Sequence, residues 1–167
     1  MGLGKGYNNI VRGILSESLS EDHVTVIEKL PIPRYDEDIA EELKVKATII
    51  RTLLNDLHAK SLVEYKRTKN KKTGWYTYKW KRRDDKIKEY IRNYLLKNLA
   101  ELNKKLDYEK QNVSFNCSCK RVPLDMAMDN SFICPDCNQK YTKYDTAEII
   151  DEITTEISRI NSLLKKT

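Results

Sequence analysis

The sequence predicts a mostly α-helical protein with small β elements, in which several short modules follow one another along the chain. Three observations lead to this prediction: apolar residues recur at helical spacing over most of the chain, one hairpin-like stretch is strongly basic, and all four cysteines lie within one 21-residue window. The 167 residues are 40% hydrophobic and 34% charged. This balance suits amphipathic helices and small cores, and it argues against a large enzyme with a deep pocket.

Glycine usage argues against a second class of protein, the nucleotide hydrolases. Four of the five glycines lie within the first 13 residues, so Gly74 is the only glycine in the rest of the chain. A glycine-rich phosphate-binding loop is therefore excluded from that part. We expect Met1–Gly13 to be a flexible or loosely docked lead-in. The chain shows neither an apolar run of about 20 residues nor the apolar stretch of a secretory signal, so we expect a cytoplasmic protein without membrane contact.

Three helices are expected in the first third of the chain. Ser20 is a suitable N-cap for a helix that ends near Leu30, where Pro31 and Pro33 force a short extended segment. A second helix opens at Asp36 and ends near Lys44, and a third covers residues 46–60. Their apolar faces are formed by Val24, Ile27, Leu30, Ile39, Ala40, Leu43, Ile49, Ile50, Leu53, Leu54 and Leu57.

The stretch that follows, LVEYKRTKNKKTGWYTYKW, predicts a β-hairpin whose polar tip ends in Gly74. Strand alternation places Val63 with Tyr65 on one face, and it places Tyr76, Tyr78 and Trp80 together on a face of the second strand. Residues 60–83 contain ten Lys or Arg and one acid, a charge of +9, whereas the rest of the chain carries −3. Three helices followed by a basic hairpin form the winged-helix arrangement.

The remainder predicts a long linking helix, a cysteine module and a C-terminal helix. The long helix runs from Asp84 to about Lys110, and the last one from Thr146 to Lys165. Their apolar stripes are explained by packing of the two helices against each other or by docking to a partner subunit. The predicted domains are a winged-helix domain with a basic wing (1–83), a linking helix (84–110), a zinc-ribbon module (111–145) and a C-terminal helix (146–167).

The cysteines favour a metal site. Two residues separate Cys134 from Cys137, which lets both sulfurs reach one ion, whereas only Ser118 separates Cys117 from Cys119. Lys120 follows the second ligand where glycine is usual, and Asn138 follows the fourth. We expect one structural zinc held by the four thiolates; a weakened or lost site and a redox pair of Cys134 with Cys137 remain as alternatives.

Nucleic-acid contact is expected from the wing and not from the third helix. That helix carries Arg51 as its only strong cation and is dominated by large aliphatic residues, so it lacks the side chains that read bases in a duplex. No catalytic residue is predicted. The candidate nucleic-acid-binding residues, which offer cations for phosphates and rings for stacking, are Lys66, Arg67, Lys69, Lys71, Lys72, Trp75 and Tyr76.

Residues 36–80, DEDIAEELKVKATIIRTLLNDLHAKSLVEYKRTKNKKTGWYTYKW, resemble the winged helix of archaeal transcription factor E, alpha subunit, a family related to the large subunit of the eukaryotic general factor IIE. The order of winged helix, long helix, CPxC-type ribbon and C-terminal helix also resembles that family over nearly the whole chain. The first cysteine pair departs from it, because the family usually has two residues between these ligands and a glycine after them.

The resemblance implies a non-enzymatic, nucleoid-associated initiation factor that binds RNA polymerase at its clamp and stalk, within a promoter complex containing basal factors. It further implies contact with single-stranded promoter DNA at the melted bubble, and a beta subunit as an additional candidate partner. Two other classes remain open: a winged-helix DNA-binding regulator with a structural zinc site, and a zinc-ribbon subunit of an enzyme.

Overall fold

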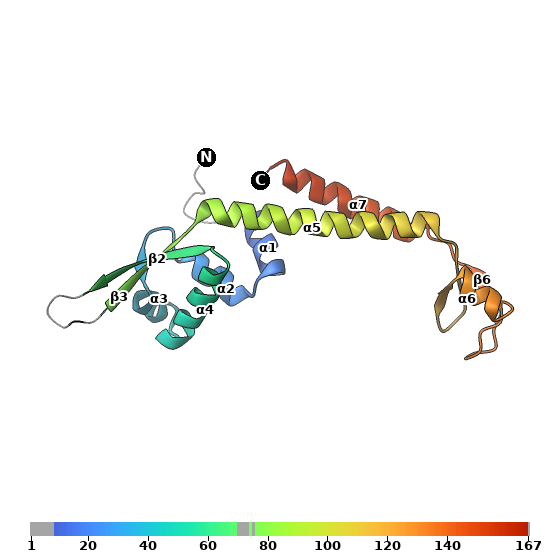
Figure 1. The fold of residues 1–167 in the computed structure, drawn as a ribbon, viewed down its shortest axis with the longest axis horizontal. Helices are drawn as coiled ribbons and strands as arrows, with labels where there is room; N and C mark the ends of the chain where they lie inside the picture. Colours follow the sequence, from blue (N-terminus) through green and yellow to red (C-terminus); the bar gives the residue numbers. More distant parts are fainter. Residues whose placement is uncertain (1–8, 70–73, 75, 167) are drawn as a thin grey trace. The chain divides into compact units, whose positions relative to one another are not determined.

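A computed structural model describes residues 9–69, 74 and 76–166 (Figure 1). The chain divides into two compact units, Met1–Tyr94 and Leu95–Thr167, and the division falls within helix α5 (Asp84–Gln111). Helices predominate and the strands form two small sheets, which confirms the predicted fold class. The boundaries of the four domains predicted from the sequence are not tested by this division and stay predictions.

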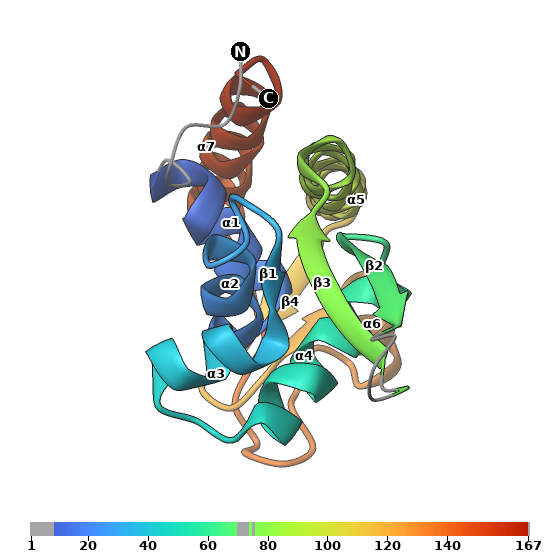
Figure 2. The same ribbon diagram turned by 90° about the vertical axis from the view of Figure 1, so that its left-hand side faces the viewer.

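The first unit is built on four short helices and a three-stranded sheet. Helix α4 packs against both α2 and α3, while α3 and α4 also contact strands of the sheet (Figure 2). Most of the predicted apolar residues are buried in this core, except that Ile49 is 48% exposed. The helices are α1 (Asn9–Ser18), α2 (Glu21–Glu28), α3 (Asp36–Leu43) and α4 (Ala47–Ala59).

From Asn9 onward, helix α1 corrects the expectation of a flexible or loosely docked lead-in over Met1–Gly13. The helix begins at Asn9 and buries Ile14 and Leu15, while the residues before Asn9 lie outside the described part of the chain. The guanidinium of Arg12 pairs with Glu28 and, at 3.3 Å, with Glu21, so α1 is joined to both ends of α2. These non-local pairs and the two buried side chains hold the segment in place despite Gly13.

The first sheet has the order β1–β3–β2, antiparallel throughout, with strands β1 (Arg34–Tyr35), β2 (Val63–Lys69) and β3 (Tyr76–Arg82). Gly74 adopts φ +76°, a conformation that side-chain-bearing residues rarely take, as expected for the glycine of a hairpin. At the base of the hairpin the buried Arg82 forms an ion pair of 2.7 Å with Asp84, the first residue of α5. This pair fixes the point where the hairpin enters α5.

The second unit contains a smaller sheet, one short helix and the C-terminal helix α7 (Ala147–Leu164). Its sheet has the order β5–β4–β6, with strands β4 (Ser114–Asn116), β5 (Arg121–Pro123) and β6 (Thr142–Lys143). A compact apolar cluster holds this sheet to the cysteine loops. Its buried members are Val122, Ala127, Cys134 and Tyr141, with Phe115 and Phe132 packed against them.

Helix α6 (Leu124–Asp129) lies between the two cysteine pairs and was not expected from the sequence. Ser131 and Phe132, just after it, both have positive φ, and the N–H of Phe132 donates to the carbonyl of Ala127 at 2.7 Å. This tight reversal presses Phe132 against Phe115, with ring centroids 5.1 Å apart. Within the described residues, no helix has the length and apolar character that crossing a membrane requires.

Candidate functional site

The four cysteines converge at one point of the second unit. Cys117 and Cys119 lie in the loop between β4 and β5, and Cys134 and Cys137 follow α6, yet all four sulfurs lie within 4.8 Å of one another. The sulfur of Cys119 is 3.3 Å from that of Cys117 and 3.5 Å from each of the other two. All four are free thiols.

This arrangement fits a metal ion. Four thiolates around a tetrahedral zinc, with Zn–S bonds of about 2.3 Å, stand about 3.8 Å from one another. The observed separations are close to that value, so the spacing of one residue in the first pair does not prevent its sulfurs from joining the second pair. The cluster is therefore able to hold a metal ion, as the sequence predicted.

The backbone around each pair supports the same interpretation. The N–H of Cys134 donates to the carbonyl of Gln139, and the N–H of Asn138 donates to the carbonyl of Cys134 at 2.8 Å. Asn138 has φ +56°, the left-handed conformation that asparagine tolerates. Lys120 is not among the described residues with positive φ, so the position where the family has glycine does not require one here.

Electrostatics distinguishes the sulfur of Cys134 from that of Cys119. Burial by itself raises the pKa of Cys134, but the nearby Tyr141 hydroxyl and the backbone N–H groups of Cys137 and Asp136 stabilise the thiolate and lower the pKa to about 6. The pKa of Cys119 is raised because its sulfur lies among those of the other three cysteines, that of Cys117 contributing most. Four adjacent thiolates repel one another, so a bound cation is what allows all of them to ionise.

The hairpin of β2 and β3, which is the wing predicted from the sequence, brings part of the predicted nucleic-acid site onto one face. Paired residues of an antiparallel ladder point to the same side, and Tyr65, Arg67 and Lys69 lie opposite Trp80, Tyr78 and Tyr76 respectively. The predicted grouping of Tyr76, Tyr78 and Trp80 follows from this register. We call these six residues the aromatic face of the wing. Its outer part is a cation–π pair, because the guanidinium carbon of Arg67 lies 3.4 Å from the centroid of the exposed Tyr76 ring.

We call the opposite face of the wing its cationic face, because it carries Lys66, Lys79 and Lys81 against one acid, Glu64, in the described strands. Lys66 lies opposite Lys79, and Lys81 lies opposite Glu64 in the next pair on the same face. Lys66 is thus separated from Arg67 and Lys69, with which the sequence analysis grouped it, while Lys79 and Lys81 were missed although strand alternation could have found them. Of the remaining candidates, Lys71, Lys72 and Trp75 lie outside the described residues.

The cation of the third helix is already engaged. Arg51 hydrogen-bonds through Nε to Asp36 and through Nη2 to Glu37 at 3.1 Å, and hydrogen bonding to Asp36 raises the pKa of the guanidinium. Three of the large aliphatic residues of α4 face the core. The exposed side of this helix therefore offers a duplex little free positive charge.

A basic hairpin with an aromatic face and a closed cluster of four thiols define a class of binding protein rather than an enzyme, since four protein ligands leave no open position on a metal for a substrate. Residues 9–111 match the model of a family described as the TFIIE alpha subunit. The chain belongs to this family. Its members are non-enzymatic transcription factors, and this chain is accordingly a general transcription initiation factor that works with the transcription machinery.

Curated relatives cover most of the chain. Transcription factor E of Methanocaldococcus jannaschii is 36% identical over 132 residues, which is 78% of this chain and 76% of the relative. Transcription factor E of Saccharolobus islandicus is 31% identical over 160 residues, or 95% and 91%. A solved structure from Methanosarcina mazei, described as a possible transcriptional regulator, has a TM-score of 0.50 at 16% identity over 59% of this chain and 84% of its own. That likeness concerns the fold alone.

Proposed function

We propose that this initiation factor binds RNA polymerase within the promoter complex and promotes or stabilises opening of the DNA. The observation that carries the proposal is the aromatic face of the wing, where Arg67, Lys69 and the exposed Tyr76 offer positive charge and a ring surface together. Unpaired bases expose rings that can stack on such a surface, whereas bases within a duplex do not. The first unit acts as a winged helix whose wing contacts single-stranded promoter DNA.

The factor depends on polymerase to bring it to the promoter. Arg51, the one strong cation of α4, is paired with Asp36 and Glu37, which argues against independent reading of a duplex. From the family resemblance, the winged helix lies near the clamp and the upstream edge of the bubble. The ribbon lies towards the clamp and stalk. A beta subunit is a further partner, and the factor acts at the nucleoid.

The cysteine cluster holds one structural zinc, with Cys117, Cys119, Cys134 and Cys137 as ligands. The sulfur spacing supports this assignment, because it is close to that of a tetrahedral thiolate site. Bound zinc would cross-link the loop after β4 to the loop after α6 and so stabilise a unit with a very small apolar cluster. Its role is in folding and docking, not in a reaction.

The proposal is tested by following strand opening and polymerase binding separately. We expect the triple variant Arg67→Gln/Lys69→Gln/Tyr76→Leu to remain associated with polymerase, because most of the remaining surface is unchanged. It should nevertheless reduce the permanganate reactivity of unpaired promoter thymines. Stimulation by the wild type should be large on promoters that melt poorly and small on templates with a preformed bubble, since stabilising an open state matters most when that state is scarce.

The matched control is Lys97→Gln/Lys104→Gln, which removes two exposed cations from α5. This variant should open promoters like the wild type. Unchanged opening by the triple variant would refute the role of the wing, and equal stimulation on premelted and duplex templates would refute the opening mechanism. Nanomolar, sequence-dependent binding of a promoter duplex without polymerase would instead support a DNA-binding regulator.

A further inference from the structure

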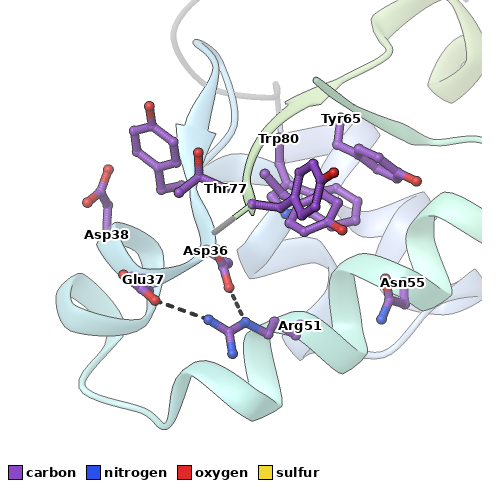
Figure 3. Close-up of a pocket in the computed structure, with 11 residues that line it drawn as sticks. Asp36, Glu37, Asp38, Arg51, Asn55, Tyr65, Thr77 and Trp80 are labelled. Atoms are coloured by element: carbon purple, nitrogen blue, oxygen red, sulfur yellow. Dashed lines mark hydrogen bonds and ion pairs between the residues drawn. The ribbon is translucent and has the colours of Figure 1, made fainter. Parts of the chain in front are cut away.

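A groove of about 970 Å³ lies within the first unit, between the aromatic face of the wing, the start of α3 and the middle of α4 (Figure 3). It is distinct from the cysteine cluster, and at its edge it includes Tyr35 and Thr77, whose strand positions lie on the other face of the sheet. Its lining combines rings with acidic and amide side chains: Tyr35, Asp36, Glu37, Asp38, Arg51, Asn55, Tyr65, Tyr76, Thr77, Tyr78 and Trp80.

The aromatic side of the groove is a preformed cluster of rings. The ring centroid of Tyr65 lies 5.2 Å from that of Tyr78 and 5.0 Å from that of Trp80. Trp80 is buried and anchors the cluster, whereas Tyr65 is 43% exposed. Because the Tyr65 ring already packs on Tyr78 and Trp80, it loses little conformational freedom when a ligand packs on its exposed side.

The opposite side of the groove is acidic. Asp36 and Glu37 point toward Arg51 and pair with it, whereas the Asp38 side chain is directed away from the guanidinium (Figure 3). Asp38 has no ion pair within the described residues. Three carboxylates against one guanidinium leave the lining with a formal charge of −2. Phosphates passing along this wall would be repelled, so the charge favours a cationic occupant.

We propose that this groove docks a polypeptide segment of a protein partner that carries arginine or lysine, with the cation between the carboxylates of Glu37 and Asp38 and the tyrosine rings. The chain itself shows that such rings accept cations. Lys79 Nζ lies 5.6 Å from the centroid of the Tyr35 ring, and Arg67 lies over Tyr76. An incoming guanidinium would make the same kind of contact and also neutralise the acidic wall.

This inference deepens the proposed function by giving the chemistry of a protein contact, and it rests on that function only for the partner's place in the transcription machinery. The test uses neither polymerase nor promoter DNA, so its failure leaves the opening mechanism untouched. Three probes are titrated into the full-length, isotope-labelled protein at low salt: the peptide acetyl-GRGRGS-amide, the same peptide with citrulline in place of arginine, and a twelve-nucleotide oligo-dT.

Two variants accompany the wild type. Glu37→Gln/Asp38→Asn removes two charges from the groove while keeping the side-chain shapes, and Glu41→Gln/Glu101→Gln removes two charges from exposed positions outside it. We expect the arginine peptide to shift the amide signals of Asp38, Asn55 and Thr77. Its affinity should be about 3- to 10-fold lower for the groove variant and unchanged for the control, because exposed ion pairs contribute modestly.

Each alternative outcome overturns the proposal. Equal affinity of the citrulline peptide would show that charge is not recognised, and equal affinity of the groove variant would show that these carboxylates are not the acceptors. Shifts scattered over the surface, or none, would mean that no such site exists. If oligo-dT moved the groove signals and the arginine peptide did not, the groove would belong to the strand-binding surface of the wing.

Discussion

The ammonium of Lys120 lies 2.7 Å from the carboxylate of Asp136 and so joins the loops that carry the two cysteine pairs. Hydrogen bonding to Asp136 raises the pKa of Lys120. Lys120, which stands where the family usually has glycine, is not among the described residues with positive φ, and its side chain contacts the opposite loop. Asn138, the corresponding residue of the second pair, keeps the left-handed conformation.

Glycine substitutions at these two positions should have different effects on zinc release. Lys120→Gly loses the ion pair and makes the unfolded chain more flexible, so we expect zinc release to a chromophoric chelator to be about 2- to 5-fold faster. Asn138→Gly removes a Cβ from a position with positive φ, so release should be unchanged or slower. Slower release from Lys120→Gly would mean that this loop is strained after all.

A second prediction concerns acid sensitivity of the first unit. Glu42 on α3 lies 2.7 Å from Lys29 and 2.5 Å from Arg34, and hydrogen bonding to Lys29 and then to Arg34 lowers its pKa. A lowered carboxyl pKa contributes stability that is present above its usual value of about 4.3 and lost as the pH falls through the lowered pKa.

Glu42→Gln should therefore reduce the urea midpoint of the first unit at pH 7, and the difference from the wild type should shrink toward zero below about pH 4. Circular dichroism at several pH values measures both. Glu41→Gln, the neighbouring exposed carboxyl, serves as the control and should leave the midpoint unchanged. A difference that persists at low pH would indicate a role for Glu42 other than its charge.

The sequence predicted those parts of the fold that depend on local periodicity. The helices at α2, α3, α4, α5 and α7 begin and end close to their predicted residues, and the hairpin places its rings on one face. Helix α1 was missed because its glycine and polar start suggest a loop. Its stability comes from burial of Ile14 and Leu15 and from the pairing of Arg12 with α2, contacts that no local pattern reveals.

In the candidate sites, too, the features that depend on local spacing could be predicted from the sequence, and those that depend on tertiary contacts could not. Cysteine spacing was enough to predict that four sulfurs converge. The pairing of Lys120 with Asp136 and the place of Tyr141 beside Cys134 depend on how the loops fold, so no local pattern reveals them. Adjacent strand residues face opposite sides, so the separation of Lys66 from Arg67 could have been inferred. The acidic groove could not, because α3 meets the wing only through the tertiary fold.

A third prediction concerns metal removal. Protein purified without added zinc should contain one zinc per chain by elemental analysis, because the four sulfurs are already close to one another. A strong chelator should loosen residues 114–143, as seen by faster amide hydrogen exchange, while the core of the first unit keeps its protection. A fully protected second unit in protein shown to be free of metal would disprove a structural role for the ion.

The last prediction separates general electrostatics from stacking on the wing. One pair of cations can be removed from each face, Arg67 with Lys69 from the aromatic face and Lys66 with Lys79 from the cationic face. Replacing either pair by glutamine should lower the salt dependence of oligo-dT binding equally, by about 1.4 in the slope of log K against log salt concentration. Any difference between the two pairs therefore reports on contacts other than charge.

We expect oligo-dT affinity to fall further for Arg67→Gln/Lys69→Gln than for Lys66→Gln/Lys79→Gln, because Arg67 also holds the Tyr76 ring in place. Tyr76→Leu, which removes no charge, should weaken binding by about 1 kcal/mol or more and leave the salt slope unchanged, since it removes a stacking surface. Fluorescence anisotropy across a salt series measures both quantities. Equal losses for the two pairs, together with normal affinity of Tyr76→Leu, would show that the wing binds strands by charge alone.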